Sequence, residues 1–183
     1  MSRFKAIRPE SATGEVRALL EAVNASLGMV PNMMRAMAAA PAVLEGYLGL
    51  SGALDRGTLS ARTREQLALA VGQANRCDYC VSAHTVLGRG AGLSETDMAR
   101  ARDGGAADPT IEAAVRFART LVRNRGVASD AELAQVRQAG LSDGEIVEIV
   151  GAVAANIFTN YLNHVAATDI DFPIVRAKVE AAA

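Results

Sequence analysis

The sequence predicts an all-α fold, and three observations lead to this prediction. Half of the 183 residues are hydrophobic, yet aromatic residues make up only 4% and Trp is absent, so Ala, Leu and Val supply most of the apolar content. Small side chains of this kind suit close helix–helix packing better than a sheet sandwich. Residues that begin and end helices recur along the chain, whereas strand-like alternation is nearly absent.

In the first half of the chain, five helices are expected between recognisable start and stop residues. They cover residues 15–27, 33–39 and 41–56, then run from Ser60 to about Ala74, and from near Cys77 to the glycines at 88, 90 and 92. The expected stops are Gly28 and Gly57, the expected caps are Asn32 and Ser60, and Pro41 fits a first helical turn.

In the second half, helix starts are expected at two pairs with the spacing of a capping box and at two further positions. The pairs are Ser94 with Asp97 and Ser142 with Glu145; the other starts are Asp108-Pro109 and Ser129-Asp130, and the stops are Gly126 and Gly140. Residues 145–164 read as one long apolar helix or two abutting ones, and Asp171-Phe172-Pro173 is a break before a final short helix.

The length suits a single domain, 1–183, with one substantial core. Within it, N-terminal helices (1–58) are expected to pack on a central segment (59–92), followed by C-terminal helices (94–180). The mean hydropathy is slightly positive, which is high for a soluble monomer. We therefore expect apolar surface to be buried against further copies in a homo-oligomer.

Charge and hydropathy exclude several classes of protein. The net charge is −1 and Lys and Arg are scattered, so no nucleic-acid partner is expected. Residues 1–9 lack the apolar stretch of a signal peptide, and the longest apolar run, 151–158, is too short to cross a bilayer. The sequence thus predicts a cytoplasmic protein without a membrane partner. In the cytoplasm a lone Cys pair is more often catalytic or metal-binding than a structural disulfide.

Candidate chemistry concentrates at Glu65, Cys77, Cys80 and His84. On one helix, residues three and four apart share a face, so His84 is placed to hydrogen-bond the Cys80 sulfur and remove its proton. If the chain turns back near Asn75, Glu65 and His84 lie about equally far from the bend and meet across two antiparallel helices. A carboxylate beside an imidazole fixes its tautomer and raises its basicity.

Both cysteines also fall in the first turn of a helix, where free N–H groups and the positive end of the dipole favour a thiolate. Other interpretations stay open at this point. A zinc ion could use Cys77, Cys80 and His84 with His164 or Glu65 as the fourth ligand. Alternatively, the cysteines could be two small buried residues, His84 a surface histidine, and Glu65 a solvated charge.

Glu65 precedes His84 by nineteen residues, and Glu145 precedes His164 by the same interval. A duplicated helical hairpin explains this spacing, and Glu145 as an ordinary capping residue explains it as well. His164 is interpreted as structural, with Asn160 and Asn163 as candidate hydrogen-bond partners. Tyr79 lines the pocket or packs as an ordinary aromatic residue, and the methionines at 29, 33, 34 and 37 are interpreted as packing residues.

The motif Glu65, Cys77-Asp78-Tyr79-Cys80 and His84 resembles the carboxymuconolactone decarboxylase superfamily in its alkylhydroperoxidase (AhpD-like) branch. The stretches 64–71 and 79–84 are similar to that branch, and 30–34 and 160–164 resemble its peroxidase-related subgroup. In the founding alkylhydroperoxidase a histidine stands where this chain has Tyr79. The decarboxylase branch generally lacks the CxxC motif.

The resemblance implies an AhpD-like helical fold, assembly into trimers or hexamers, and peroxide reduction through the dithiol without cofactor or metal. Cys80 would be the peroxidatic thiolate, Cys77 the resolving thiol, and His84 with Glu65 the proton relay. The implied partners are a hydroperoxide substrate and an external dithiol reductant, either a lipoyl or a thioredoxin-like protein. The alternatives are a protein disulfide oxidoreductase or redox sensor, a decarboxylase-type enzyme, and a non-catalytic helical module.

Overall fold

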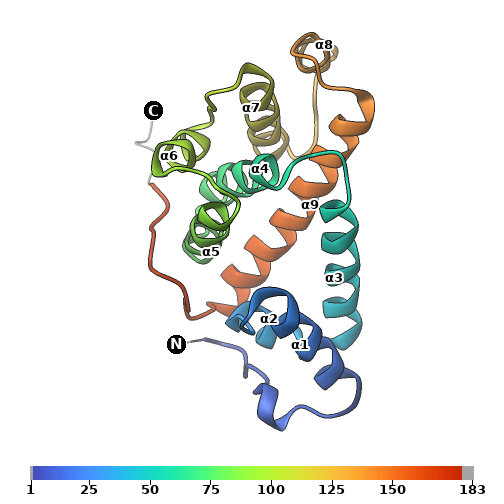
Figure 1. Cartoon of the computed structure of the whole chain (residues 1–183), viewed down its shortest axis with the longest axis vertical. Helices are drawn as coiled ribbons and strands as arrows, with labels where there is room; N and C mark the ends of the chain where they lie inside the picture. The colour runs from blue at the N-terminus through green and yellow to red at the C-terminus, as the bar shows by residue number, and fades with distance from the viewer. Residues whose placement is uncertain (1, 179–183) are drawn as a thin grey trace.

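The computed structural model describes residues 2–178, which form helices and no strands (Figure 1). The prediction of an all-α fold is confirmed. In chain order the elements are η1 (Pro9–Ser11), α1 (Gly14–Leu27), α2 (Asn32–Met37), α3 (Pro41–Asp55), α4 (Ala61–Ala74), α5 (Asp78–Gly90), α6 (Glu95–Asp103), α7 (Pro109–Arg123), α8 (Asp130–Gln138) and α9 (Asp143–Ala166).

Helix α4 lies at the centre of the molecule, and α5, α6, α7 and α9 all pack against it (Figure 1). Its residues 66–73 are buried without interruption. One apolar core joins α4 to α7, α8 and α9, with Leu67, Val115 and Ile149 among its fully buried members. This core fixes α4 and α9 as the rigid frame around which the remaining helices are arranged.

A second core joins the N-terminal helices to the beginning of α5. Leu20, Leu44 and the methionines of α2 pack there against Cys77, Tyr79 and Cys80. The dithiol is therefore enclosed by α1–α3 on one side and the central frame on the other.

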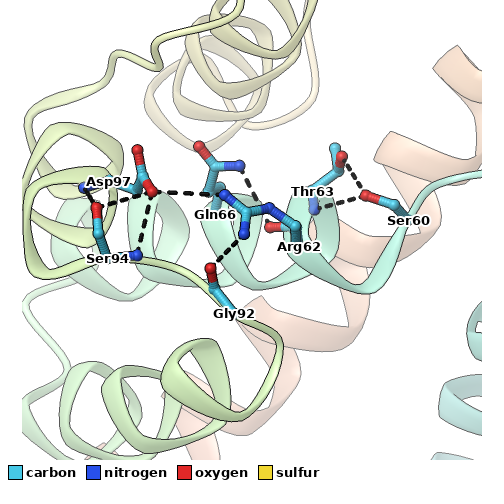
Figure 2. A network of polar contacts seen from close by, with 7 residues as sticks. All are labelled: Ser60, Arg62, Thr63, Gln66, Gly92, Ser94 and Asp97. Carbon is cyan, nitrogen blue, oxygen red and sulfur yellow. Dashed lines mark hydrogen bonds and ion pairs between the residues drawn. The ribbon is translucent and has the colours of Figure 1, made fainter.

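The predicted helix starts are confirmed by their caps. The Ser60 hydroxyl accepts from Thr63 N–H, and capping boxes form at Ser94 with Asp97 and at Ser142 with Glu145. Figure 2 shows how the start of α4 is tied to the loop before α6. Arg62 donates to the Gly92 carbonyl and pairs with Asp97 at 3.5 Å. These contacts join the two helices of the α4–α5 hairpin at the end away from the turn.

Two predictions about local structure are wrong. Asn32 is the first residue of α2 rather than its cap; its backbone N–H donates to Asp171 Oδ2 at 2.7 Å, so a distant carboxylate caps the helix. The final short helix is absent from residues 174–178, which run extended along α5 and bond to Asp78 and Ser82. The rest of that prediction lies outside the described residues.

Residues 145–164 lie in one continuous helix, α9, so the duplicated helical hairpin is also wrong. At 24 residues, with a mean hydropathy of 1.2 over its best window, α9 has the length and composition of a membrane-spanning helix. A core helix of a folded domain passes the same test, and α9 packs on α3, α4 and α7.

Candidate functional site

The site is built on the turn between α4 and α5, close to the predicted bend at Asn75. Arg76 adopts a left-handed conformation (φ 54°), and the Cys77 N–H donates to the Gly72 carbonyl at 2.9 Å. This is the hydrogen-bond pattern of a Schellman motif, which reverses the chain within a few residues. A Cβ on Gly72 would lie 3.4 Å from Cys80 Cβ, so the start of α5 packs directly against this position of α4.

The turn brings Glu65 and His84 together, as their distances from the bend predict. His84 Nδ1 lies 2.8 Å from Glu65 Oε2, and both side chains are about one-fifth exposed. Burial alone would lower the pKa of His84, but the charge and hydrogen bond of Glu65, together with Cys80, raise it. Glu65 therefore favours the protonated form of the His84 imidazole.

Cys77 and Cys80 are both almost fully buried, at 2% and 3% exposure. Cys77 is the cap of α5: its Sγ accepts the backbone N–H of Cys80 at 3.3 Å. The neighbouring Cys77 thiol is also the largest influence lowering the pKa of Cys80 to about 7. Burial opposes this shift, while His84 adds to it. The neighbouring Cys80 thiol and burial raise the pKa of Cys77, so Cys80 is the thiol that ionises first.

The predicted hydrogen bond from His84 to the Cys80 sulfur is absent among the described residues. His84 turns its Nδ1 to Glu65, and its influence on Cys80 is coulombic. The amide of Asn163 on α9 occupies the hydrogen-bonding position instead, with Nδ2 at 3.4 Å from Cys80 Sγ. The imidazole thus remains one helical turn from the sulfur, with its Nε2 free of hydrogen bonds within residues 2–178.

A pocket of about 80 Å³ opens beside the Glu65–His84 pair. Both members of the pair line it, with Tyr47 and Ser51 of α3 and Asn156 of α9 among the other walls. A pocket of this volume accommodates a few water-sized molecules. Burial is the main influence that raises the pKa of Tyr47 to about 12, so its phenol is neutral near pH 7.

Two further residues that the sequence singles out, Tyr79 and His164, make structural contacts. Tyr79 packs edge-on against Phe172 and donates to Asp171 Oδ1 at 2.8 Å, so it is a packed aromatic residue outside the pocket. His164 bonds through Nε2 to the Asn75 carbonyl at 3.0 Å, a contact that satisfies the end of α4. Within the described residues no hydrogen bond joins it to its predicted partners, Asn160 and Asn163.

Asn160 and Asn163 are the site residues that sequence reasoning missed. Asn160 is completely buried, and its Oδ1 accepts from Asn75 Nδ2 at 2.7 Å; its amide also lowers the pKa of Cys80. The available signal was a pair of amides three residues apart on a largely apolar helix. The zinc arrangement finds no support in geometry: residues 2–178 contain no group of three His, Cys, Asp or Glu side chains able to hold a metal ion.

Residues 41–123, which extend from α3 to α7 and include Glu65, both cysteines and His84, match the model of the carboxymuconolactone decarboxylase family. This match covers just under half of the chain and shows a likeness to that family over these residues. The fold of the described residues is AhpD-like. It is similar to a peroxidase-related protein from Ralstonia eutropha JMP134, which has an alkylhydroperoxidase AhpD core, with a TM-score of 0.83 at 22% identity over 93% of this chain and 92% of that one.

A similar fold occurs in a protein with a different stated reaction. A variant of the debrominase Bmp8, in complex with 2,3,4-tribromopyrrole, is similar with a TM-score of 0.80 at 16% identity, over 93% of this chain and 92% of that one. An uncharacterised protein from Haemophilus influenzae is 47% identical over 45 residues, which cover 24% of this chain and 40% of that protein. The fold is therefore common to relatives whose chemistry differs.

Proposed function

We propose that this protein is a thiol-dependent peroxidase in which Cys80 attacks the hydroperoxide and Cys77 resolves the product. The observation that carries the proposal is the position of the Glu65–His84 pair, one helical turn from a buried thiol whose pKa is lowered to about 7. Together these four residues supply a nucleophile, a proton donor, a group that orients the donor, and a second thiol.

In the first step the Cys80 thiolate attacks the terminal oxygen of the hydroperoxide. The S–O bond forms as the O–O bond breaks, so the sulfur is oxidised to a sulfenic acid and the peroxide is reduced to an alkoxide. The alkoxide takes a proton from His84, which the Glu65 carboxylate holds in its cationic form. We place entry of the peroxide at the pocket beside this pair, because its size suits hydrogen peroxide or a small alkyl hydroperoxide.

In the second step the Cys77 sulfur attacks the Cys80 sulfenic acid and water leaves, giving the Cys77–Cys80 disulfide. An external dithiol then reduces the disulfide by exchange and is itself oxidised. Because both sulfurs are almost fully buried, a slender lipoyl arm suits this step better than the broad face of a thioredoxin-like protein. The cycle needs neither metal nor cofactor.

Burial of the dithiol also favours peroxide reduction over general disulfide exchange with proteins, the main alternative. A peroxide reaches an enclosed sulfur, whereas a protein disulfide requires an exposed one. Comparing second-order rate constants for a small hydroperoxide and for a protein disulfide separates the two. A faster reaction with the protein disulfide would favour the oxidoreductase or redox-sensor role.

The direct test is hydroperoxide consumption with a dithiol recycling system. Cys80→Ser should reduce turnover by at least ~10³-fold, because the nucleophile is lost. Cys77→Ser should still consume one equivalent of peroxide but should not turn over. Undiminished turnover in Cys80→Ser would refute the role of Cys80, and activity towards 2,3,4-tribromopyrrole in place of hydroperoxides would redirect the proposal to dehalogenation.

We further propose that the protein is a cytoplasmic homo-oligomer, a trimer or hexamer. Large apolar side chains are exposed along α9 and on the neighbouring face of α3; they are Val43, Leu50, Val147, Val150, Phe158, Tyr161 and Val165. Large apolar side chains exposed in such numbers typically lie in an interface. Light scattering after size exclusion checks it, and a monomer of 19.1 kDa would contradict it.

A further inference from the structure

Two asparagines of α9 face the Cys80 sulfur from the side opposite its own helix. Asn163 Nδ2 donates to Cys80 Sγ at 3.4 Å and also contacts Met33 Sδ at 3.2 Å. Asn160 lies one turn earlier, completely buried, with its Oδ1 fixed by the Asn75 amide at 2.7 Å. Since the Oδ1 atom is held by Asn75, the Nδ2 atom of Asn160 is directed away from that contact.

Each of these amides keeps one polar atom without a partner. Asn160 Nδ2 and Asn163 Oδ1 are buried and make no hydrogen bond within residues 2–178. Most buried polar groups in folded proteins are hydrogen-bonded, because leaving one unpaired is costly. The unpaired donor of Asn160 and the unpaired acceptor of Asn163 are the two groups that a hydroxyl needs, since a hydroxyl accepts one hydrogen bond and donates another.

We propose that Asn160 and Asn163 form an amide cradle for Cys80, in which Asn163 holds the thiolate and the two free amide atoms receive the oxygen that the sulfur acquires. The second half of this inference rests on the proposed peroxidase function. When the thiolate attacks, the transferred oxygen keeps its hydrogen and the alkoxide is protonated by His84. The resulting S–OH group donates to Asn163 Oδ1 and accepts from Asn160 Nδ2, until Cys77 displaces the hydroxyl as water.

Electrostatics at the sulfur agree with this geometry, because both amides lower the pKa of Cys80. The other titratable groups facing Cys80 are Cys77, Tyr79 and His84 on its own helix and Tyr47 on α3. Burial raises the pKa of both tyrosines, so neither phenol changes charge near neutral pH. The asparagines are therefore the neutral donors that can be altered without adding or removing a titrating neighbour.

The first experiment measures the thiolate half directly, in a Cys77→Ser background that leaves one cysteine. The rate of Cys80 alkylation is followed against pH for Asn163→Leu and Asn163→Ala, both of which remove the N–H donor without adding a charge. Each should raise the apparent pKa of Cys80 by about one unit, since a hydrogen bond to a charged group shifts ionisation by this order. An unchanged pKa in either folded variant would overturn the cradle.

The matched control is Thr159→Val. Thr159 is a buried residue of the same helix whose hydroxyl donates to its own helix at the Asn156 carbonyl, 3.0 Å away. Removing that hydroxyl should leave the pKa of Cys80 unchanged. A shift equal to that of the Asn163 variants would assign the effect to helix packing and would also overturn the proposal.

The second experiment tests whether the two free amide atoms bind the oxygen that the sulfur acquires. In the Cys77→Ser background, the sulfenic acid formed by one equivalent of hydrogen peroxide is trapped with dimedone at increasing delays. Asn160→Leu should shorten the lifetime of the trappable species several-fold, and an unchanged lifetime would overturn this half. If no sulfenic acid forms but the alkylation pKa responds to Asn163, the peroxidase proposal fails while the thiolate contact stands.

Wild-type protein gives a measurement that no folding defect can obscure. With asparagine labelled by ¹⁵N, the side-chain NH₂ signals of Asn160 and Asn163 should shift with pH along the curve of Cys80 alkylation. Signals that stay constant while Cys80 ionises would overturn the cradle.

Discussion

In two segments of this chain a histidine follows a glutamate by nineteen residues, but the two segments fold differently. Glu65 and His84 lie on the two arms of the α4–α5 hairpin and meet at 2.8 Å. Glu145 and His164 lie on the single helix α9, ~28 Å apart at ~1.5 Å per residue. In α9 the glutamate caps its own helix and the histidine bonds to the Asn75 carbonyl. The turn between the helices, rather than the interval, creates the acid–imidazole pair.

The second segment still contributes to the site, in a different way. Because α9 is unbroken, it passes alongside the hairpin and presents Asn160 and Asn163 to the sulfur of Cys80. The hairpin thus supplies the reacting thiols and the proton donor, and the long helix supplies neutral donors. Parallel substitutions in the two segments separate these contributions.

The largest difference is expected between the two histidines. His84→Asn should lower the rate of peroxide consumption by ~10²- to 10³-fold, because the proton donor for the alkoxide is lost. His164→Asn should change that rate less than about threefold and should lower the free energy of unfolding by ~1 kcal/mol, the value of one hydrogen bond. Steady-state kinetics and urea unfolding measure both. Equal losses of rate would contradict the division of roles.

Substitutions of the two glutamates should also differ in their effect on the rate of peroxide consumption, but by less than those of the two histidines. Glu65→Gln keeps the shape but removes the charge that raises the pKa of His84, so the rate should fall by about tenfold at pH 7. Glu145→Gln weakens a capping box and should lower the free energy of unfolding by less than ~1 kcal/mol, with little effect on the rate. A larger kinetic loss in Glu145→Gln than in Glu65→Gln would reverse our assignment.

The pH dependence of the rate should come from Cys80 and His84, which both lie in the hairpin. The rate should rise with an apparent pKa of about 7 as Cys80 becomes the thiolate, and it should fall at higher pH when His84 loses its proton. Glu65→Gln should move the falling limb to lower pH. The lowered pKa of Cys80 also contributes stability at alkaline pH that is lost as the pH falls through about 7. A rate independent of pH between 5 and 9 would contradict the thiolate mechanism.

The hairpin was predictable from sequence because its determinants are local. Cap residues such as Ser60 mark the helix ends, and equal distances from the bend at Asn75 place Glu65 opposite His84. The partners of Cys80 on α9 were not predictable, since packing of a distant helix determines which of its faces meets the sulfur. Asp171 as the cap of α2 depends on long-range packing in the same way.

The smallest effects concern two non-glycine residues with left-handed conformations, one in each segment. Arg76 (φ 54°) lies in the hairpin turn, and Ala167 (φ 47°) ends α9. Replacing either by glycine relieves the clash of Cβ and should raise the free energy of unfolding by ~0.5–1 kcal/mol, without altering peroxide consumption. Chemical denaturation measures the gain, and a loss of stability at Arg76→Gly would show that its side chain supports the turn.

The central claim is that Cys77 and Cys80 react as a peroxidatic pair. Intact-protein mass spectrometry after one equivalent of hydroperoxide, without reductant, tests it most directly. We predict the loss of two hydrogen atoms and a peptide map that contains the Cys77–Cys80 disulfide. An unchanged mass, with both thiols still open to alkylation after unfolding, would contradict the account.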